Sequence, residues 1–317
     1  MPIAFTPSPL CLAFRRVPLS SRKGGALLDV WPRDGAATVL FLPGTMLGPL
    51  QYRVFLRALY AQGFSVAALH LTGHGDTRHI WRFHLPDLLD DVRRAAAWLH
   101  QTSGSPVILG GHSQGGIMTL ALACGGSLPD ENGRQRITLA PLDGVAAFFA
   151  VSAVFPQSAD LLRLTLFAPL LAHRPSIQKN MLRLARRFPA LPLPLFSYLS
   201  PRRLLAGHGT VDLPLAGRRF TYPLALLSDL LSLRLNETAH RPFLLMGARN
   251  DALFTPDILR ATLARLDAPS KALHLLPTGG HMLLMQEETA REAVACVTLH
   301  ACALGLPLRC GCGPSAC

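Results

Sequence analysis

The segment Gly111-His112-Ser113-Gln114-Gly115 constrains the fold of this chain more than any other. It follows the apolar run Val107–Leu109 and precedes the helical pattern Gly115–Ala123, so a strand, a tight turn and a helix are predicted. A serine in such a turn adopts a strained backbone conformation, and side chains two positions away on either side would collide. Gly111 and Gly115 remove those side chains. The turn exposes the Ser113 hydroxyl at a helix amino terminus, where negative charge is stabilised. This context is typical of a nucleophilic serine.

A serine hydroxyl becomes nucleophilic only when a base takes its proton and a carboxylate orients that base. Asp251 stands just after the apolar run Phe243–Met246, and His281 stands after the apolar run Ala272–Leu276. The carboxyl ends of parallel strands meet at one edge of a sheet. Ser113, Asp251 and His281 are therefore predicted to form a catalytic triad, although they are far apart in the sequence.

Other acids and bases occupy less suitable places in the sequence. Asp143 precedes its predicted strand, Asp257 lies in the first turn of a predicted helix, and Asp229 lies in a long segment that interrupts the strand–helix alternation. His274 falls within a predicted strand, and His208 lies in the interrupting segment. Asp251 and His281 remain the preferred pair.

An oxyanion hole requires two N–H donors that face the negative charge of the tetrahedral intermediate. The first predicted donor is the backbone N–H of Gln114, directly after the nucleophile. The second is expected from the loop after the apolar run Thr38–Leu42, where Gly44 allows close backbone approach. The N–H of Thr45 is the preferred donor in this loop, and that of Met46 is the alternative.

Short apolar runs alternate with helical patterns along most of the chain, which predicts an α/β fold with a mostly parallel central sheet flanked by helices. Two apolar runs without a helix between them, Ala13–Ser20 and Ala26–Trp31, predict an antiparallel leading edge. The predicted core comprises residues 1–155 and 242–306, with an inserted helical cap at residues 156–241 and a flexible tail rich in cysteine and glycine at 307–317.

The triad motifs, together with Leu42-Pro43-Gly44 and residues 51–77, resemble the α/β-hydrolase superfamily. The chain is most similar to its branch of monoacylglycerol lipases, lysophospholipases and serine aminopeptidase-like esterases, over residues 38–155 and 242–306. Gly73-His74-Gly75 matches the G-H-G loop of that branch, which implies a structural turn beside the site. Pro43-Gly44 replaces the usual His-Gly, and His70-Leu71-Thr72 replaces the usual Asp-x-Arg.

The resemblance implies a serine hydrolase that cleaves carboxylic esters through an acyl-enzyme on Ser113, without a cofactor or metal. An apolar cap containing arginines favours lipid-like esters with medium or long acyl chains. An acyltransferase or thioesterase would use the same triad, and a non-catalytic ligand-binding protein could keep the same fold. C–C bond hydrolysis or lyase chemistry is a further alternative, whereas a haloalkane dehalogenase would need a carboxylate in place of Ser113.

The net charge of +12 is concentrated in one part of the chain. Residues 155–241 contain twelve Lys or Arg and four Asp or Glu, so +8 lies in this segment. Because the arginines are interleaved with leucines and prolines and no nucleic-acid-binding motif accompanies them, contact with an anionic membrane surface is favoured over nucleic acid. A solvated basic face explains the charge equally well.

The seven cysteines are odd in number and follow no disulfide framework, which favours reduced thiols in the cytoplasm. Three of them (Cys310, Cys312 and Cys317) cluster near the carboxyl terminus, without a histidine to complete a tetrahedral zinc site. The amino terminus has no basic region before its apolar stretch, so no signal peptide is predicted. The sequence predicts no oligomeric state.

Overall fold

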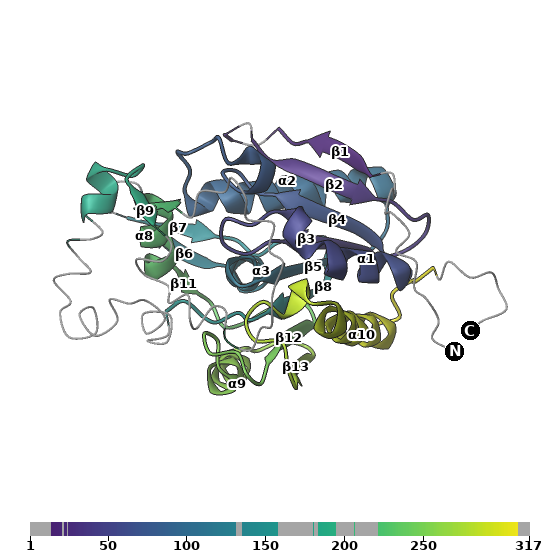
Figure 1. Cartoon of the computed structure of the whole chain (residues 1–317). Coiled ribbons are helices and arrows are strands. Elements are labelled where there is room, and N and C mark those ends of the chain that lie inside the picture. The colour runs from purple at the N-terminus through teal and green to yellow at the C-terminus, as the bar shows by residue number, and fades with distance from the viewer. Residues whose placement is uncertain are drawn as a thin grey trace.

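An eight-stranded sheet lies at the centre of the fold (Figure 1), with the strand order β1-β2-β4-β3-β5-β8-β12-β13. The computed structural model describes residues 14–20, 22–23, 25–130, 135–157, 180, 183–194, 206 and 221–309. The strands of the central sheet are β1 (Arg15–Pro18), β2 (Leu27–Trp31), β3 (Thr38–Leu42), β4 (Ser65–His70), β5 (Val107–His112), β8 (Val145–Val151), β12 (Phe243–Ala248) and β13 (Lys271–Leu276).

The sheet is parallel from β4 to β13, whereas β1 and β2 are antiparallel to their neighbours. Both the mostly parallel sheet and the antiparallel leading edge are confirmed. Every residue of β3, β4, β5 and β12 is buried. Strands covered on both faces read as continuous apolar runs, which is why their positions could be predicted from the sequence.

Helices cover both faces of the sheet. On one face, α1 (Arg53–Ala61) and α10 (Glu287–Ala303) share an apolar core with the sheet. On the other face, α2 (Leu85–Ser103), α3 (Gln114–Cys124) and α9 (Pro256–Arg265) pack in a second core. Short 3-10 turns, η1 (Pro49–Tyr52), η2 (Gly75–Thr77) and η4 (Leu283–Met285), join some of these elements.

The helix α1 illustrates how the sequence places these cores. Phe55, Leu56 and Leu59 recur at helical spacing and are buried, while Arg53 and Arg57 are exposed on the opposite side. The apolar side faces the sheet, and the basic side remains available at the surface.

Two smaller sheets lie outside the central one. The strands β11 (Arg234–Leu235), β6 (Gly126–Pro129) and β7 (Arg136–Leu139) form an antiparallel sheet that is not apparent from the sequence. The other pairs β9 (Pro192–Pro194) with β10 (Thr221–Pro223), directly before α8 (Leu224–Ser232). In Figure 1, β9 and α8 lie at the end of the molecule opposite α10.

Most of the segment predicted as a cap, residues 156–241, lies outside the described residues, and its described parts contain both α8 and short strands. At the carboxyl end, the carbonyl of Pro307 accepts a hydrogen bond from the N–H of Ala37, and the N–H of Arg309 donates one to Gly63. These contacts hold residues 307–309 on the core, although a tail is predicted from residue 307. Cys310, Cys312 and Cys317 lie outside the described residues. Among the helices described, none is long and apolar enough to cross a bilayer.

Candidate active site

Ser113 lies in the tight turn between β5 and α3, as predicted. Its φ of 55° and ψ of −116° place a non-glycine residue in a strained conformation. The turn leaves no room for side chains at the flanking glycines: a Cβ on Gly111 would lie 2.3 Å from the Gly115 carbonyl oxygen, and one on Gly115 would lie 2.4 Å from that of Leu42. The two glycines therefore allow the turn that presents Ser113.

The three residues of the predicted triad lie in hydrogen-bonding contact. His281 Nε2 is 3.0 Å from Ser113 Oγ, and His281 Nδ1 is 3.1 Å from Asp251 Oδ2. His281 lies in the loop after β13, and Asp251 lies in the loop after β12. The histidine ring stacks on Phe254, with centroids 5.2 Å apart and an interplanar angle of 15°. This packing fixes the plane of the imidazole between the hydroxyl and the carboxylate.

Asp251 is buried and accepts hydrogen bonds at both carboxylate oxygens. Oδ1 accepts from the N–H groups of Leu253 and Phe254 at 2.8 and 2.9 Å, and Oδ2 accepts from the Ser152 hydroxyl at 2.9 Å. Burial by itself raises the pKa of Asp251, but the neighbouring His281 and the hydrogen bonds that the carboxylate accepts outweigh this effect, so its pKa is lowered. Asp251 is therefore ionised at neutral pH.

The loop after β3 approaches the nucleophile from the other side. The Thr45 hydroxyl donates to the side-chain oxygen of Gln114 at 3.3 Å. The N–H of Gly44 donates to the Tyr52 hydroxyl and is therefore not an oxyanion donor. Within the described part of the chain, the backbone N–H groups of Thr45, Met46 and Gln114 have no hydrogen-bond acceptor. The loop thus offers both the preferred donor, Thr45, and the alternative, Met46.

A buried hydrogen-bonded chain connects this loop to the loop that carries His281. The Tyr52 hydroxyl accepts from Gly44 N–H and lies 2.8 Å from His112 Nδ1. His112 Nε2 lies 2.8 Å from the backbone oxygen of His281. Because a carbonyl can only accept, Nε2 carries the proton and Nδ1 accepts from the tyrosine.

No role was predicted from the sequence for Tyr52, His112 or Ser152. His112 occupies the first variable position of G-x-S-x-G, and this place in the motif is the feature of the sequence that could have pointed to it. Ser152 follows β8 with a φ of 48°, and its hydroxyl donates to Asp251. Neither Tyr52 nor Ser152 belongs to a motif that would single it out.

The Gly73-His74-Gly75 turn lies near the site, with Tyr222 between His74 and Gln114. The Tyr222 hydroxyl donates to the side-chain oxygen of Gln114 and lies 3.2 Å from His74 Nε2. His74 Nδ1 lies 3.0 Å from the Thr72 carbonyl, to which it donates. Burial lowers the pKa of His74 to about 4, so the ring is neutral.

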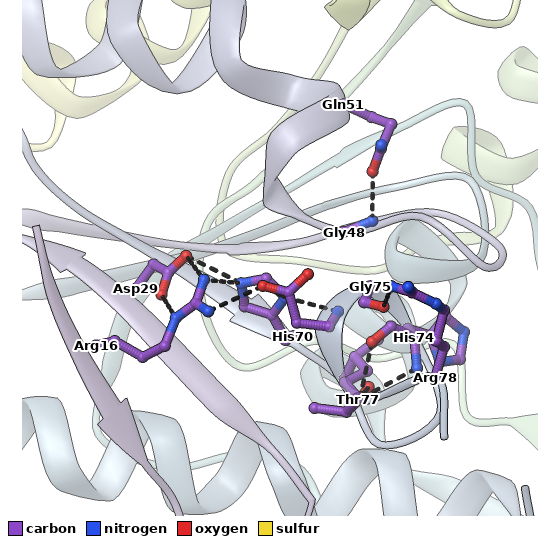
Figure 2. A network of polar contacts seen from close by, with 11 residues as sticks. Arg16, Asp29, Gly48, Gln51, His70, His74, Gly75, Thr77 and Arg78 are labelled. Carbon is purple, nitrogen blue, oxygen red and sulfur yellow. Dashed lines mark hydrogen bonds and ion pairs between the residues drawn. The ribbon is translucent and has the colours of Figure 1, made fainter. Parts of the chain in front are cut away.

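A second polar network surrounds His70, where the resemblance leads one to expect an aspartate (Figure 2). Asp29 accepts from Arg16 Nε at 2.6 Å, from Arg16 Nη2 at 2.9 Å and from His70 Nε2 at 2.9 Å. Arg16 Nη1 also lies 2.9 Å from Asp76 Oδ2. His70 Nδ1 accepts the N–H of Asp76. This network ties β1, β2 and β4 to the turn after β4.

The rival candidates lie away from the triad or bind elsewhere. Asp257 pairs with Arg260 on α9, and Asp229 accepts the Leu85 N–H at the start of α2. His274 lies within β13, and His208 is outside the described residues. No group of three His, Cys, Asp or Glu side chains in the described ranges could hold a metal ion.

A family model described as the alpha/beta hydrolase family matches residues 39–295. The chain belongs to this family. The match spans most of the chain, and the predicted α/β-hydrolase fold is confirmed. Comparison with curated protein sequences finds no significant match.

Solved structures share the fold of this α/β hydrolase at low sequence identity. One is a soluble variant of monoglyceride lipase from Saccharomyces cerevisiae in complex with a substrate analogue (TM-score 0.63, 13% identity, 94% of this chain and 99% of that chain). Others are a thermophilic esterase from Thermogutta terrifontis (0.58, 16%, 92% and 98%) and monoacylglycerol lipase from Paleococcus ferrophilus (0.56, 16%, 92% and 99%). At these identities the likeness shows the fold alone.

Proposed function

We propose that this α/β hydrolase is a serine hydrolase that cleaves carboxylic esters through an acyl-enzyme on Ser113. The observation that carries the proposal is the continuous contact from Ser113 Oγ through His281 to Asp251, at 3.0 and 3.1 Å. These distances are within the range that proton transfer requires. The strained backbone of Ser113 and the buried, ionised Asp251 support the same proposal.

In the proposed reaction, Ser113 Oγ attacks the ester carbonyl while its proton passes to His281 Nε2. The negative charge that develops on the carbonyl oxygen is held by the N–H groups of Gln114 and Thr45. The intermediate collapses when His281 returns the proton to the departing alcohol, which leaves an acyl group on Ser113. Water then gives a proton to His281 and attacks the acyl group, and His281 returns that proton to Ser113 Oγ as the acid is released. Asp251 stabilises the charged imidazole in both halves of the cycle.

The proposed substrates are lipid-like esters with medium or long acyl chains. Two of the solved structures with this fold are named monoglyceride or monoacylglycerol lipases, and a third is named an esterase. The described part of the proposed cap segment includes the strongly apolar helix α8 (Leu224–Ser232). The basic segment 155–241 leads us to propose peripheral contact with anionic lipid, and a cytoplasmic location remains our expectation.

The direct test is hydrolysis of p-nitrophenyl esters from two to sixteen carbons by the full-length protein and by its Ser113→Ala variant. We expect turnover by the wild type, with a maximum at medium or long chains, and loss of about 10⁴-fold or more in the variant. Equal rates in both proteins would refute the acyl-enzyme. Labelling of folded protein by a fluorophosphonate probe, lost in Ser113→Ala, separates a catalyst from a ligand-binding protein.

The same triad would serve an acyltransferase or a thioesterase, so the acceptor must be tested separately. Added alcohol or thiol should not divert the acyl group from water if the protein is a hydrolase. A transfer product that outweighs the free acid would favour the acyltransferase, and faster cleavage of acyl thioesters than of matched esters would favour the thioesterase.

A further inference from the structure

A cavity of about 370 Å³ lies between β1, β2 and α1, apart from the catalytic residues. Cavities of about 300–1,000 Å³ are of the size that holds small molecules. Gly48 and Gly75 form part of its wall. The two glycines touch closely, because a Cβ on Gly48 would lie 2.8 Å from the Cα of Gly75. Gly48 follows the loop that carries Thr45, so the cavity lies behind the proposed oxyanion loop.

One part of the cavity wall is apolar and aromatic. Phe14 and Trp31 have ring centroids 5.6 Å apart, and Leu56 is buried beside them in the lining. Phe14 and Leu50 are 48% and 54% exposed, although both are large apolar side chains. Apolar groups left in water at the rim of a cavity indicate a surface that a ligand can cover.

The acidic residues in the lining already have partners. Both oxygens of Asp29 accept hydrogen bonds from Arg16, and Asp29 also binds His70 (Figure 2). Asp76 forms an ion pair with the same guanidinium. These carboxylates are therefore engaged within the protein.

The lining also contains two arginines whose side chains, unlike these carboxylates, have no partner among the described residues. Arg53 and Arg57 are one turn apart on α1, both exposed and both part of the cavity wall. In the part of the chain that the structure describes, neither guanidinium group forms an ion pair or a hydrogen bond. Two neighbouring guanidinium groups that pair with no carboxylate of the protein are suited to bind an anionic group such as the carboxylate of a ligand.

We infer that this cavity is a second ligand site, which binds an amphiphilic carboxylate with its headgroup at Arg53 and Arg57 and its apolar part against Phe14, Trp31 and Leu50. The inference depends on the cavity, its exposed apolar rim and its two free cations. It does not depend on hydrolysis at Ser113, and it is therefore tested in a protein that cannot form an acyl-enzyme.

The test is calorimetric titration of the full-length Ser113→Ala protein with decanoate, decanol and decyl phosphate. We expect saturable binding of decanoate that weakens about tenfold or more when Arg53→Gln and Arg57→Gln are added, since both guanidinium partners are lost. The control is Arg82→Gln with Arg241→Gln, which removes the same charge at two exposed positions outside the cavity. Any decanoate that binds at the catalytic site contributes equally to all these proteins.

A second pair of variants tests the apolar wall. Leu50→Asp should weaken decanoate binding, whereas Leu299→Asp, at a 69% exposed position on α10, should not. The inference is overturned if the Arg53/Arg57 variant binds decanoate as the parent does, if the Arg82/Arg241 control weakens binding equally, or if decanol binds as tightly as decanoate. Binding of decyl phosphate without decanoate would also overturn it, because the headgroup would then be a phosphate.

Discussion

Two buried aspartate–histidine pairs in this molecule differ in their third partner. Asp251 and His281 are 3.1 Å apart, and Asp29 and His70 are 2.9 Å apart. All four residues are at most 5% exposed. In the first pair the second ring nitrogen of the histidine faces the Ser113 hydroxyl, whereas in the second pair it accepts a backbone N–H.

The two aspartates also differ in what balances their charge. Asp29 is bound in a two-point contact by Arg16. Asp251 has no Lys or Arg partner among the described residues, and its other donors are neutral N–H and hydroxyl groups. Its charge is therefore available to stabilise a protonated His281. A buried aspartate–histidine pair is suited to base catalysis when the histidine is the carboxylate's only cationic partner and its free nitrogen faces a hydroxyl.

The largest expected effect distinguishes the two histidines. His281→Ala should lower kcat for a p-nitrophenyl ester by about 10⁵-fold, because Ser113 loses its base. His70→Ala should lower kcat by less than about tenfold and should reduce thermal stability, because His70 belongs to the network that joins three strands to a turn. Comparable losses of kcat in the two variants would contradict the assignment of different roles.

The two aspartates should differ in the same way. Asp251→Asn is expected to lower kcat by about 10⁴-fold, since the imidazole loses its orienting and stabilising anion. Asp29→Asn should instead lower the free energy of unfolding by about 2 kcal/mol, because Arg16 loses its charged acceptor. Steady-state kinetics and urea unfolding of both variants provide the measurement. A kcat loss in Asp29→Asn as large as that in Asp251→Asn would remove the distinction.

A third buried histidine, His74, has no carboxylate partner among the residues that the structure describes and should make folding sensitive to acid. Its pKa of about 4 in the folded protein lies below the ordinary 6.5, so the unfolded chain binds the proton first as the pH falls. Stability from this group is complete above pH 6.5 and is lost progressively down to about pH 4, for a total of about 3 kcal/mol.

Urea unfolding of His74→Gln between pH 7 and 4 checks this expectation. The variant should lack that part of the pH dependence, and His79→Gln, at an exposed position nearby, should retain it. Parallel pH profiles for wild type and His74→Gln would show that the buried ring does not govern acid sensitivity.

The smallest effect is expected from the hydrogen-bonded chain that joins the Thr45 loop to the loop that carries His281. Tyr52→Phe should lower kcat about tenfold with little change in KM, because Gly44 N–H loses its acceptor and the Thr45 loop is held less firmly. His112→Gln should act through the same chain, so the double variant should lose little more than the worse single variant. Additive losses would show that the two residues act separately.

Much of the fold and the triad could be predicted because the determining signals are local. Buried strands are continuous apolar runs, and the elbow needs glycines at fixed positions around Ser113. The Asp29–Arg16 pair could not be predicted, because it depends on the register in which Arg16 faces Asp29 across β1 and β2. The contacts of Tyr52 and His112 likewise depend on tertiary packing, and the sheet formed by β6, β7 and β11 joins residues about 100 positions apart.

Where Gly48 meets Gly75, the wall between the cavity and the loop that carries Thr45 is formed by main-chain atoms in close contact. Main chain has no rotamers to absorb a displacement, so a group that pushes against this wall from behind must shift the peptide groups themselves. Occupancy of the cavity and kcat at Ser113 are therefore expected to change together. Even the single methyl group of a Gly48→Ala variant would separate the Thr45 loop from the turn at Gly75.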